Sequence, residues 1–237
     1  MRPLTLLNTR AEHQLASLTK KIEAAGARSL EVPLIRIEAV TPPAVPTLRK
    51  EDWLVFTSVN SVHFWEALVP DKQVHTACVG EKTAAAARAK GYTVSLIPSQ
   101  YDAESLAEAL IQRTDEETRI VYPRSAKSRM VLKEQLTAAG RHFADPVVYD
   151  TVPNEASQEN LKKAVHEVDG VLFLSPSAVH AFFHFCGTHE IPPLFYGCIG
   201  GVTEEVCRSY TDRRIIVPDT YTIEALLTKI MKEKVKK

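Results

Sequence analysis

The sequence has no long hydrophobic run and no excess charge of either sign. Its 237 residues include 29 Lys and Arg against 29 Asp and Glu, so the formal net charge at pH 7 is zero. A chain without a basic field has no general means of holding nucleic acid or an anionic bilayer. The apolar residues near the N-terminus are too few for a signal peptide, and no later stretch is long enough to span a bilayer. We therefore expect a cytoplasmic protein with no nucleic-acid or membrane partner, which binds any anionic ligand through local groups.

Cysteine is scarce, and the sequence has no metal-ligand motif. The four cysteines are Cys78, Cys186, Cys198 and Cys207. None forms a C-x-x-C pair, so buried reduced thiols are favoured over disulfides or a zinc site. His180 and His184 have the i, i+4 spacing of metal ligands, but the Glu of H-E-x-x-H and a nearby third ligand are missing. We expect a partly packed helix face there.

An internal repeat organises the chain. Residues 56–65 (FTSVNSVHFW) resemble residues 173–183 (FLSPSAVHAFF). The similarity continues at one constant offset, which pairs Cys78 with Cys198, Gly80 with Gly200, Thr83 with Thr203 and Tyr101 with Tyr221. A weaker match relates residues 4–35 to residues 119–149 and pairs Arg10 with Arg124, Gly26 with Gly140 and Ile35 with Tyr149. The segments therefore follow one another in the order A, B, A′, B′.

The repeated segments predict an α/β fold. Each A segment has a strand, an amphipathic helix ending at a Gly, and a second strand, whereas each B segment alternates strands and helices three times. Runs such as WLVFTS and GVLFLS are continuously apolar, which is typical of parallel strands buried on both faces. The class is therefore α/β, built from two similar halves.

The connections between segments predict how these halves form domains. B joins A′ through a short link, so the two should share a domain of residues 45–149. The Pro-rich stretch after A and the stretch TVPNEASQEN (151–160) after A′ both predict extended crossings. We expect a split domain of residues 1–38 plus 154–237, with connectors at 39–44 and 150–153. Two lobes on paired connectors predict an interdomain cleft, a common ligand site.

Residues at the predicted strand ends are the candidates for binding. Ser58 and Ser175 end apolar strands and precede helices, so they suit both helix N-caps and an anion site at the helix N-termini. The turns VGEKTA (79–84) and IGGVTE (199–204) are alike, but neither is a G-x-G-x-x-G or P-loop fingerprint. A nucleotide-binding enzyme therefore has only weak support.

Two arginines and one tyrosine remain open to more than one interpretation. Arg10 and Arg124 follow strands at matched positions and suit carboxylate clamps, although surface ion pairs are just as common for such arginines. Tyr149 places a phenol where the other half has Ile35. The pattern alone favours an aromatic side chain at a strand end whose hydroxyl reaches water.

A set of short motifs, in order and along nearly the whole chain, resembles the uroporphyrinogen-III synthase family. The motifs are Thr9-Arg10, VFTSVNSV (55–62), CVGEKTA (78–84), YPRS (122–125), VYDTVP (148–153), FLSPSAV (173–179) and CIGGVTEE (198–205). The resemblance implies a lyase that dehydrates and cyclises the linear tetrapyrrole hydroxymethylbilane, through an azafulvene and a spiro intermediate, with ring D inverted. It also implies a monomer of two flavodoxin-like parallel-sheet domains on a two-stranded β-ladder linker, with no cofactor and no metal. A transient contact with hydroxymethylbilane synthase is a further hypothesis.

The resemblance also implies roles for individual residues. Tyr149 matches the family tyrosine that assists departure of the substrate hydroxyl. The positions that match contacts to the substrate carboxylates are Thr57, Ser58, Thr83, Ser175, Ser177 and Thr203. Arg10, Arg124 and Gly200 complete the predicted substrate-binding set.

Two turns depart from the family pattern. Residues 200–204 read Gly-Gly-Val-Thr-Glu where the family commonly has a Gly-Pro-Thr-Thr-Ala-like turn, and residues 124–129 lack the family's Gly. These departures favour an alternative, a non-catalytic two-lobed small-molecule binding or sensory module of the same fold. Tyr149, Thr57 and Ser58 are retained and favour the enzyme.

Overall fold

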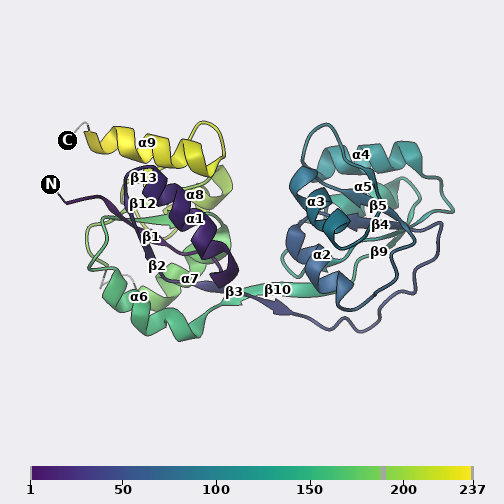
Figure 1. The fold of residues 1–237 in the computed structure, drawn as a ribbon, viewed down its shortest axis with the longest axis horizontal. Coiled ribbons are helices and arrows are strands. Elements are labelled where there is room, and N and C mark those ends of the chain that lie inside the picture. Colours follow the sequence, from purple (N-terminus) through teal and green to yellow (C-terminus); the bar gives the residue numbers. More distant parts are fainter. Residues whose placement is uncertain (1, 188–190, 236–237) are drawn as a thin grey trace. The chain divides into compact units, whose positions relative to one another are not determined.

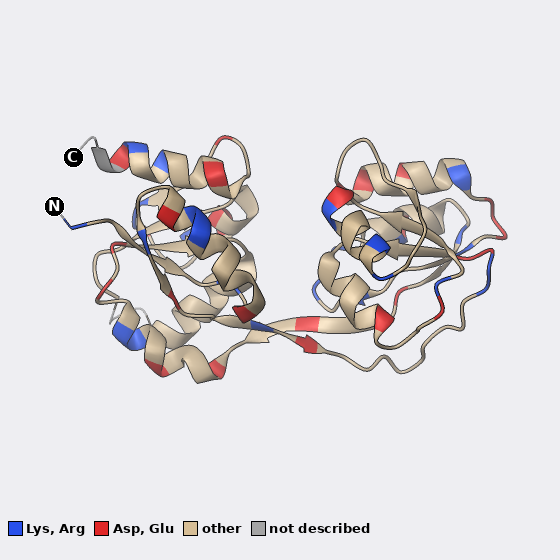
Figure 2. Ribbon diagram, in the orientation of Figure 1, with Lys and Arg blue, Asp and Glu red and all other residues tan. Residues whose placement is uncertain are grey.

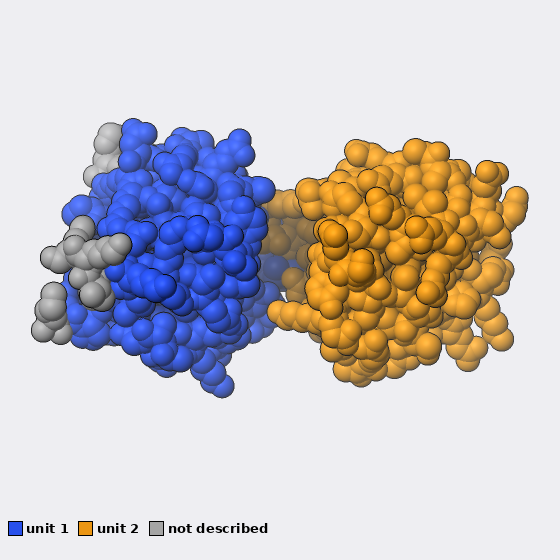
Figure 3. Space-filling view, turned by 90° about the horizontal axis from the view of Figure 1, so that it is seen from above, with its two compact units in different colours: residues 1–37, 152–237 blue, residues 38–151 orange. Residues whose placement is uncertain are grey.

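The computed structural model describes residues 2–187 and 191–235 and divides into two compact units (Figure 3). Unit 1 comprises residues 1–37 and 152–237, and unit 2 comprises residues 38–151. Each unit contains a parallel five-stranded sheet with helices on both faces (Figure 1), which confirms the predicted α/β class. None of the described helices is long and apolar enough to cross a membrane.

Unit 1 has the strand order of a flavodoxin-like sheet. Its strands are β1 (Thr5–Asn8), β2 (Arg28–Glu31), β11 (Gly170–Phe173), β12 (Phe195–Cys198) and β13 (Ile215–Ile216), in the order β13-β12-β11-β1-β2. Its helices are α1 (Glu12–Ala24), α6 (Gln158–Ala164), α7 (Pro176–Cys186), α8 (Gly201–Arg208) and α9 (Ile223–Val235). Helices α1 and α9 pack with Leu6 on one face of the sheet, and α6, α7 and α8 pack with Leu7 on the other. Burial on both faces explains the continuously apolar strands.

Unit 2 repeats this sheet with the chain entering at a different strand. Its strands are β4 (Trp53–Phe56), β5 (His75–Cys78), β6 (Val94–Leu96), β7 (Arg119–Val121) and β9 (His142–Ala144), in the order β6-β5-β4-β7-β9. Its helices are α2 (Val59–Glu66), α3 (Glu81–Ala89), α4 (Ala103–Arg113) and α5 (Val131–Ala138). Helices α4 and α5 pack together over one face, and α2 and α3 also contact each other. Matching β4 with β11 superposes the two orders, so unit 2 is a circular permutation of unit 1, as the A, B, A′, B′ repeat requires.

The chain passes between the units in two strands. Strands β3 (Ile35–Ala39) and β10 (Val147–Pro153) are neighbours in a three-stranded sheet with the short strand β8 (Arg124–Ser125), in the order β3-β10-β8. The Val40 N–H donates to Val148 O and the Asn154 N–H donates to Leu34 O, both at 2.9 Å, so β3 and β10 run antiparallel. The predicted two-stranded ladder is therefore present, with β8 as an unpredicted third strand.

The second crossing is shorter than predicted. Residues 151–160 were expected to be extended, but β10 ends at Pro153, and the 3₁₀ helix η1 (Glu155–Ser157) leads directly into α6. Leu161 and Ala164 of α6 are buried in the core of unit 1, and this burial stabilises the short helix.

Several local predictions are confirmed. The side chains of Ser58 and Ser175 accept backbone N–H groups at the starts of α2 and α7. Gly26 and Gly140 follow α1 and α5 with φ values of 85° and 79°, the left-handed conformation that favours glycine after a helix. The four cysteines, all in the described part of the chain, are buried thiols that form no disulfide.

Candidate functional site

The predicted site residues lie at the carboxyl ends of parallel strands in both units. In unit 1, Arg10 follows β1, Ser175 follows β11 and Gly200 follows β12. In unit 2, Thr57 and Ser58 follow β4. Sheets of this kind bind ligands at this edge, close to the point where the strand order reverses. That point lies between β1 and β11 in unit 1 and between β7 and β4 in unit 2.

Tyr149 lies at the carboxyl edge of the sheet in unit 2, and its hydroxyl is hydrogen-bonded to Ser58. The residue belongs to β10 and is 8% exposed, and its hydroxyl lies 2.9 Å from Ser58 Oγ. Its ring stacks on Phe64 of α2, with the ring centroids 5.5 Å apart and the planes 16° apart. The side chain of Tyr149 is therefore largely buried, and its hydroxyl is bonded to another side chain of the protein. The contact to Ser58 spans 91 residues of sequence.

Ser58 is oriented by the start of α2. Its Oγ accepts the Ser61 N–H at 3.0 Å, and Ser61 Oγ accepts the Ser58 N–H at 3.3 Å, which together form a capping box. The hydroxyl proton of Ser58 can be donated either to Ser61 Oγ, 3.3 Å away, or to the Tyr149 oxygen. When it is donated to Tyr149, the phenol proton of Tyr149 is free for a ligand.

The surroundings of Tyr149 keep its phenol protonated at neutral pH. Burial raises the pKa of Tyr149 above its usual value, and the hydrogen bond with Ser58 lowers it in part. The phenol is therefore a hydrogen-bond donor throughout the neutral range.

Two aromatic residues of this cluster were not among the predicted site residues. Phe64 fixes the plane of the Tyr149 ring. Tyr122, which is 4% exposed, has its hydroxyl 3.0 Å from Thr57 Oγ1. Phe64 lies in the repeated segment 56–65, and Tyr122 stands in the YPRS motif, two residues before Arg124.

The matched arginines differ in whether their charge is already paired. Arg124 Nε donates to Asp145 at 2.8 Å, and Lys133 contacts the other oxygen of Asp145 at 3.1 Å. Arg10 is half-buried, and within residues 2–187 and 191–235 its guanidinium has neither a hydrogen bond nor an ion pair. Burial lowers the pKa of Arg10 below its usual value, yet an arginine stays charged at neutral pH. Figure 2 shows charges of both signs scattered over each unit, so Arg10 offers local cationic binding without a basic surface.

The remaining predicted residues lie in the first turns of helices. Ser177 is half-buried in α7, and Gly200 is the N-cap of α8. Thr83 and Thr203, in the first turns of α3 and α8, are only 6% and 3% exposed. Their hydroxyls present little surface to a ligand, so the backbone N–H groups of these turns are the more accessible donors.

The histidine pair on α7 is not part of a metal cluster among the residues that the structure describes. His180 Nδ1 lies 2.8 Å from the Tyr210 hydroxyl, and both His180 and His184 are exposed.

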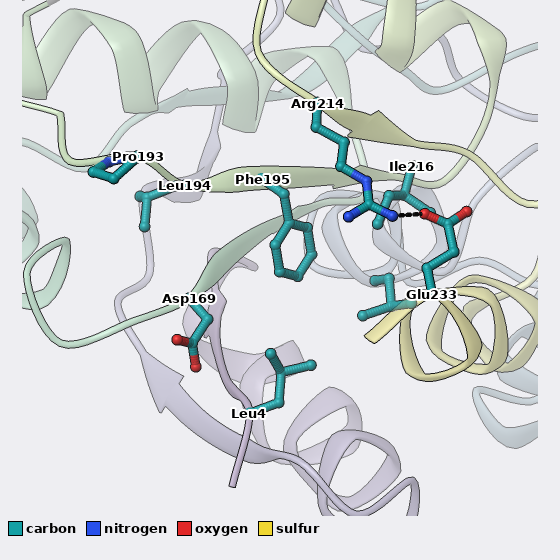
Figure 4. A pocket seen from close by; sticks show the side chains of 9 residues that line it. Leu4, Asp169, Pro193, Leu194, Phe195, Arg214, Ile216 and Glu233 are labelled. Carbon is teal, nitrogen blue, oxygen red and sulfur yellow. Dashed lines mark hydrogen bonds and ion pairs between the residues drawn. The ribbon is translucent and has the colours of Figure 1, made fainter. Parts of the chain in front are cut away.

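A pocket of about 350 Å³ in unit 1 lies at the opposite edge of the sheet (Figure 4). Its lining includes Asp169, which precedes β11, and Arg214, which precedes β13, so it opens at the amino ends of the strands. Arg214 pairs with Glu233, and Asp169 pairs with Arg2. The charged residues of this pocket are already paired with each other or with neighbours, and the pocket lies at the amino ends of the strands. Ligands of such sheets bind at the carboxyl ends, so this pocket is not the candidate site.

Comparison with known protein families identifies the family of this chain. Residues 16–228 match the family model described as uroporphyrinogen-III synthase HemD. The chain belongs to the uroporphyrinogen-III synthase family. Uroporphyrinogen-III synthases act in tetrapyrrole biosynthesis as hydro-lyases, so the chain belongs to an enzyme family.

Individual relatives are distant but cover most of the chain. The uroporphyrinogen-III synthase of Synechococcus elongatus is 25% identical over 95% of this chain and 94% of its own length. That of Chlorobaculum parvum is 27% identical over 79% of this chain and 81% of its own length. The chain spans about half, 48%, of the porphyrin biosynthesis protein HemD of Ruminiclostridium josui, at 24% identity.

Solved uroporphyrinogen-III synthases share the fold. The Helicobacter pylori enzyme aligns with a TM-score of 0.69 and 17% identity, over 98% of this chain and 100% of its own. A mutant of the Thermus thermophilus enzyme aligns with a TM-score of 0.59 and 16% identity, over 99% of this chain and 100% of its own. The two-sheet α/β architecture is therefore that of uroporphyrinogen-III synthase structures.

Proposed function

We propose that this chain closes hydroxymethylbilane to uroporphyrinogen III and that Tyr149 is its proton donor. The observation that carries the proposal is the phenol of Tyr149, held 2.9 Å from Ser58 Oγ and stacked on Phe64 at the ligand-binding edge of unit 2. The family to which the chain belongs supplies the activity, that of a hydro-lyase in tetrapyrrole biosynthesis.

The first step needs only a weak acid. The electron-rich pyrrole of the bilane expels its hydroxyl readily and forms an azafulvene, so a phenol is a strong enough donor. Tyr149 gives its proton to the leaving oxygen, water departs, and the Ser58 proton stabilises the phenolate. The proton lost when ring D regains its aromaticity returns to Tyr149, so the net change is the loss of one water. Because no electrons are gained or lost, the reaction needs no redox cofactor.

The second requirement is to direct ring closure. Attack must occur at the substituted carbon of ring D, which gives a spiro intermediate that fragments and recloses with that ring inverted. Orientation of a flexible chain is worth up to about 7–11 kcal/mol of barrier in well-aligned intramolecular reactions. We propose that Arg10 binds a substrate carboxylate, because its guanidinium has no partner among the described residues. The N–H groups that begin α3, α7 and α8 suit further carboxylates.

The setting of the reaction is part of the proposal. We expect the chain to act as a monomer in the cytoplasm. We also expect a transient contact with hydroxymethylbilane synthase, because free bilane closes by itself to the type I isomer.

The test is an isomer analysis. Hydroxymethylbilane is generated in situ, the protein is added, and the oxidised uroporphyrins are separated by chromatography. The expected result is a shift from the type I to the type III isomer. Type I alone, from folded protein, would reject the enzyme and favour a non-catalytic binding module.

A further inference from the structure

Two exposed tyrosines occupy equivalent places at the carboxyl edges of the two sheets. Tyr101 lies between β6 and α4 in unit 2, and Tyr221 lies between β13 and α9 in unit 1. They are 66% and 70% exposed, in each case far more than an aromatic side chain used for packing. Within residues 2–187 and 191–235, neither hydroxyl has a hydrogen-bond partner.

Each tyrosine ring rests on the glycine that begins the neighbouring helix. A Cβ atom added to Gly80, the N-cap of α3, would lie 2.9 Å from Tyr101 Cγ. A Cβ atom added to Gly200, the N-cap of α8, would lie 3.3 Å from the Tyr221 ring. One ring face therefore covers the glycine, while most of the side chain remains open to solvent.

The tyrosine and its glycine belong to the internal repeat, and they match in both halves although adjacent residues differ. The two residues after the glycine are Glu81 and Lys82 in unit 2 but Gly201 and Val202 in unit 1. The tyrosine and its glycine match in both halves although their immediate neighbours have diverged in charge and polarity. A single exposed aromatic needs no explanation, but two in equivalent places at a ligand-binding edge do.

We propose that Tyr101 and Tyr221 bind pyrrole rings of the linear tetrapyrrole. The inference rests on the proposed function. The bilane carries pyrrole N–H donors and aromatic carbon surface, and the face of a tyrosine ring accepts N–H groups and packs against such rings. Each tyrosine hydroxyl can also donate to a substrate carboxylate. The glycine beneath sets the height of the ring, so that the exposed face stands beside the N–H groups at the start of the helix.

The experiment measures KM and kcat for type III formation in single variants of the full chain. Tyr101→Ala and Tyr221→Ala should each raise KM about fivefold, with kcat changed less than twofold, because each removes one ring contact of ordinary strength. Tyr101→Phe should stay within about twofold of the wild-type KM, since the ring face is retained. Unchanged KM values in both alanine variants would overturn the proposal.

A second variant moves the Tyr101 ring without removing it. Gly80→Ala should raise KM as Tyr101→Ala does, because the new Cβ atom displaces the ring. The double variant Gly80→Ala/Tyr101→Ala should match Tyr101→Ala alone, since the methyl group then no longer meets the ring. Independent, multiplying effects in the double variant would contradict the proposed role of the ring.

Tyr210→Ala is the matched control for a structural tyrosine. Tyr210 is 38% exposed, follows α8 at the opposite edge of the sheet, and stacks on Phe183 with ring centroids 4.7 Å apart. Its removal should lower the melting temperature and leave KM unchanged. Failure of the wild-type protein to form the type III isomer would instead reject the proposed function, so the two failures are distinguishable.

Discussion

The two units share one sheet order but carry different side chains at the carboxyl edges of their sheets. Unit 2 has the buried phenol of Tyr149 with its hydroxyl held by Ser58, and its arginine at the matched position, Arg124, is paired with Asp145. Unit 1 has Ile35 in place of the phenol and, among the described residues, no partner for the guanidinium of Arg10. We propose that the two units divide part of the work, with proton donation by Tyr149 in unit 2 and side-chain binding of a substrate carboxylate by Arg10 in unit 1.

The largest expected effect on activity comes from removing the phenol hydroxyl of Tyr149, which unit 1 lacks at the matched position, Ile35. Tyr149→Phe should lower kcat by about a hundredfold or more, because a positioned general acid contributes about that much. KM should change little, since the ring remains stacked on Phe64. Steady-state formation of the type III isomer measures both constants.

Tyr122→Phe is the control for this variant. It removes a second buried phenol, one that bonds to Thr57 and not to Ser58. A much smaller loss of kcat is expected. Full activity of the Tyr149 variant would remove Tyr149 from the mechanism and with it the division of work between the units.

The same substitution should affect substrate binding at Arg10 and stability at Arg124. Arg10→Gln should raise KM about tenfold or more with little change in stability, because a charge-assisted contact to substrate is lost. Arg124→Gln should mainly lower the melting temperature, by roughly 2–8 °C, because Asp145 loses its principal partner. Thermal unfolding and KM, measured on both proteins, separate the two effects. If the Arg124 variant shows the larger rise in KM, the assignment of binding to Arg10 is wrong.

Removing either capping serine should lower stability, but only the removal of Ser58 should lower activity. Ser58→Ala and Ser175→Ala each remove an N-cap, which is worth about 1 kcal/mol of unfolding free energy. Only Ser58 also touches Tyr149, so only its loss should slow kcat and raise the pKa of Tyr149 further. Urea unfolding should show a loss of stability in both variants, while kcat falls only in the Ser58 variant. Equal kcat values in the two variants would show that the Ser58 contact is not used in the reaction.

The sequence predicted those parts of the molecule that depend on local pattern. Apolar strands, helix periods, serine caps and the glycines after α1 and α5 all repeat within the chain, so the fold and the residues at the strand ends could be inferred. Helix α6 could not be inferred, because its seven residues are too few to show a helical period and its burial in unit 1 decides its structure.

The partners of the site residues were out of reach of sequence reasoning for a different reason. The contact between Tyr149 and Ser58 spans 91 residues. In the sequence alone, Ser58 is explained by helix capping and Tyr149 by a place at a strand end, so neither residue points to the other. The pairing of Arg124 with Asp145 spans 21 residues, and both interpretations of the arginine, as a clamp or as an ion pair, suited the sequence. Tyr101 and Tyr221 were visible as a matched pair, but their exposure and their glycine contacts exist only in the folded chain.

The last expected effect concerns stability alone, and in it the two units should behave alike. Burial raises the pKa of Tyr92 in unit 2 and that of Tyr196 in unit 1, each to about 12. In the unfolded chain these phenols ionise near their usual pKa of about 10. The unfolded state therefore holds fewer protons than the folded state above that pH, and stability falls as the pH rises from about 10 to about 12. Urea unfolding at a series of alkaline pH values measures the loss.

Tyr92→Phe tests the contribution of unit 2 to this loss. The Tyr92 hydroxyl is buried without a hydrogen-bond partner among the described residues, so its removal should leave stability at about pH 8 unchanged or slightly higher. At high pH the variant should lose less stability than the wild type, because one of the two raised phenols is gone while Tyr196 remains. An unchanged alkaline loss would mean that Tyr196 alone responds, and the two units would then differ in their cores as they do at their edges.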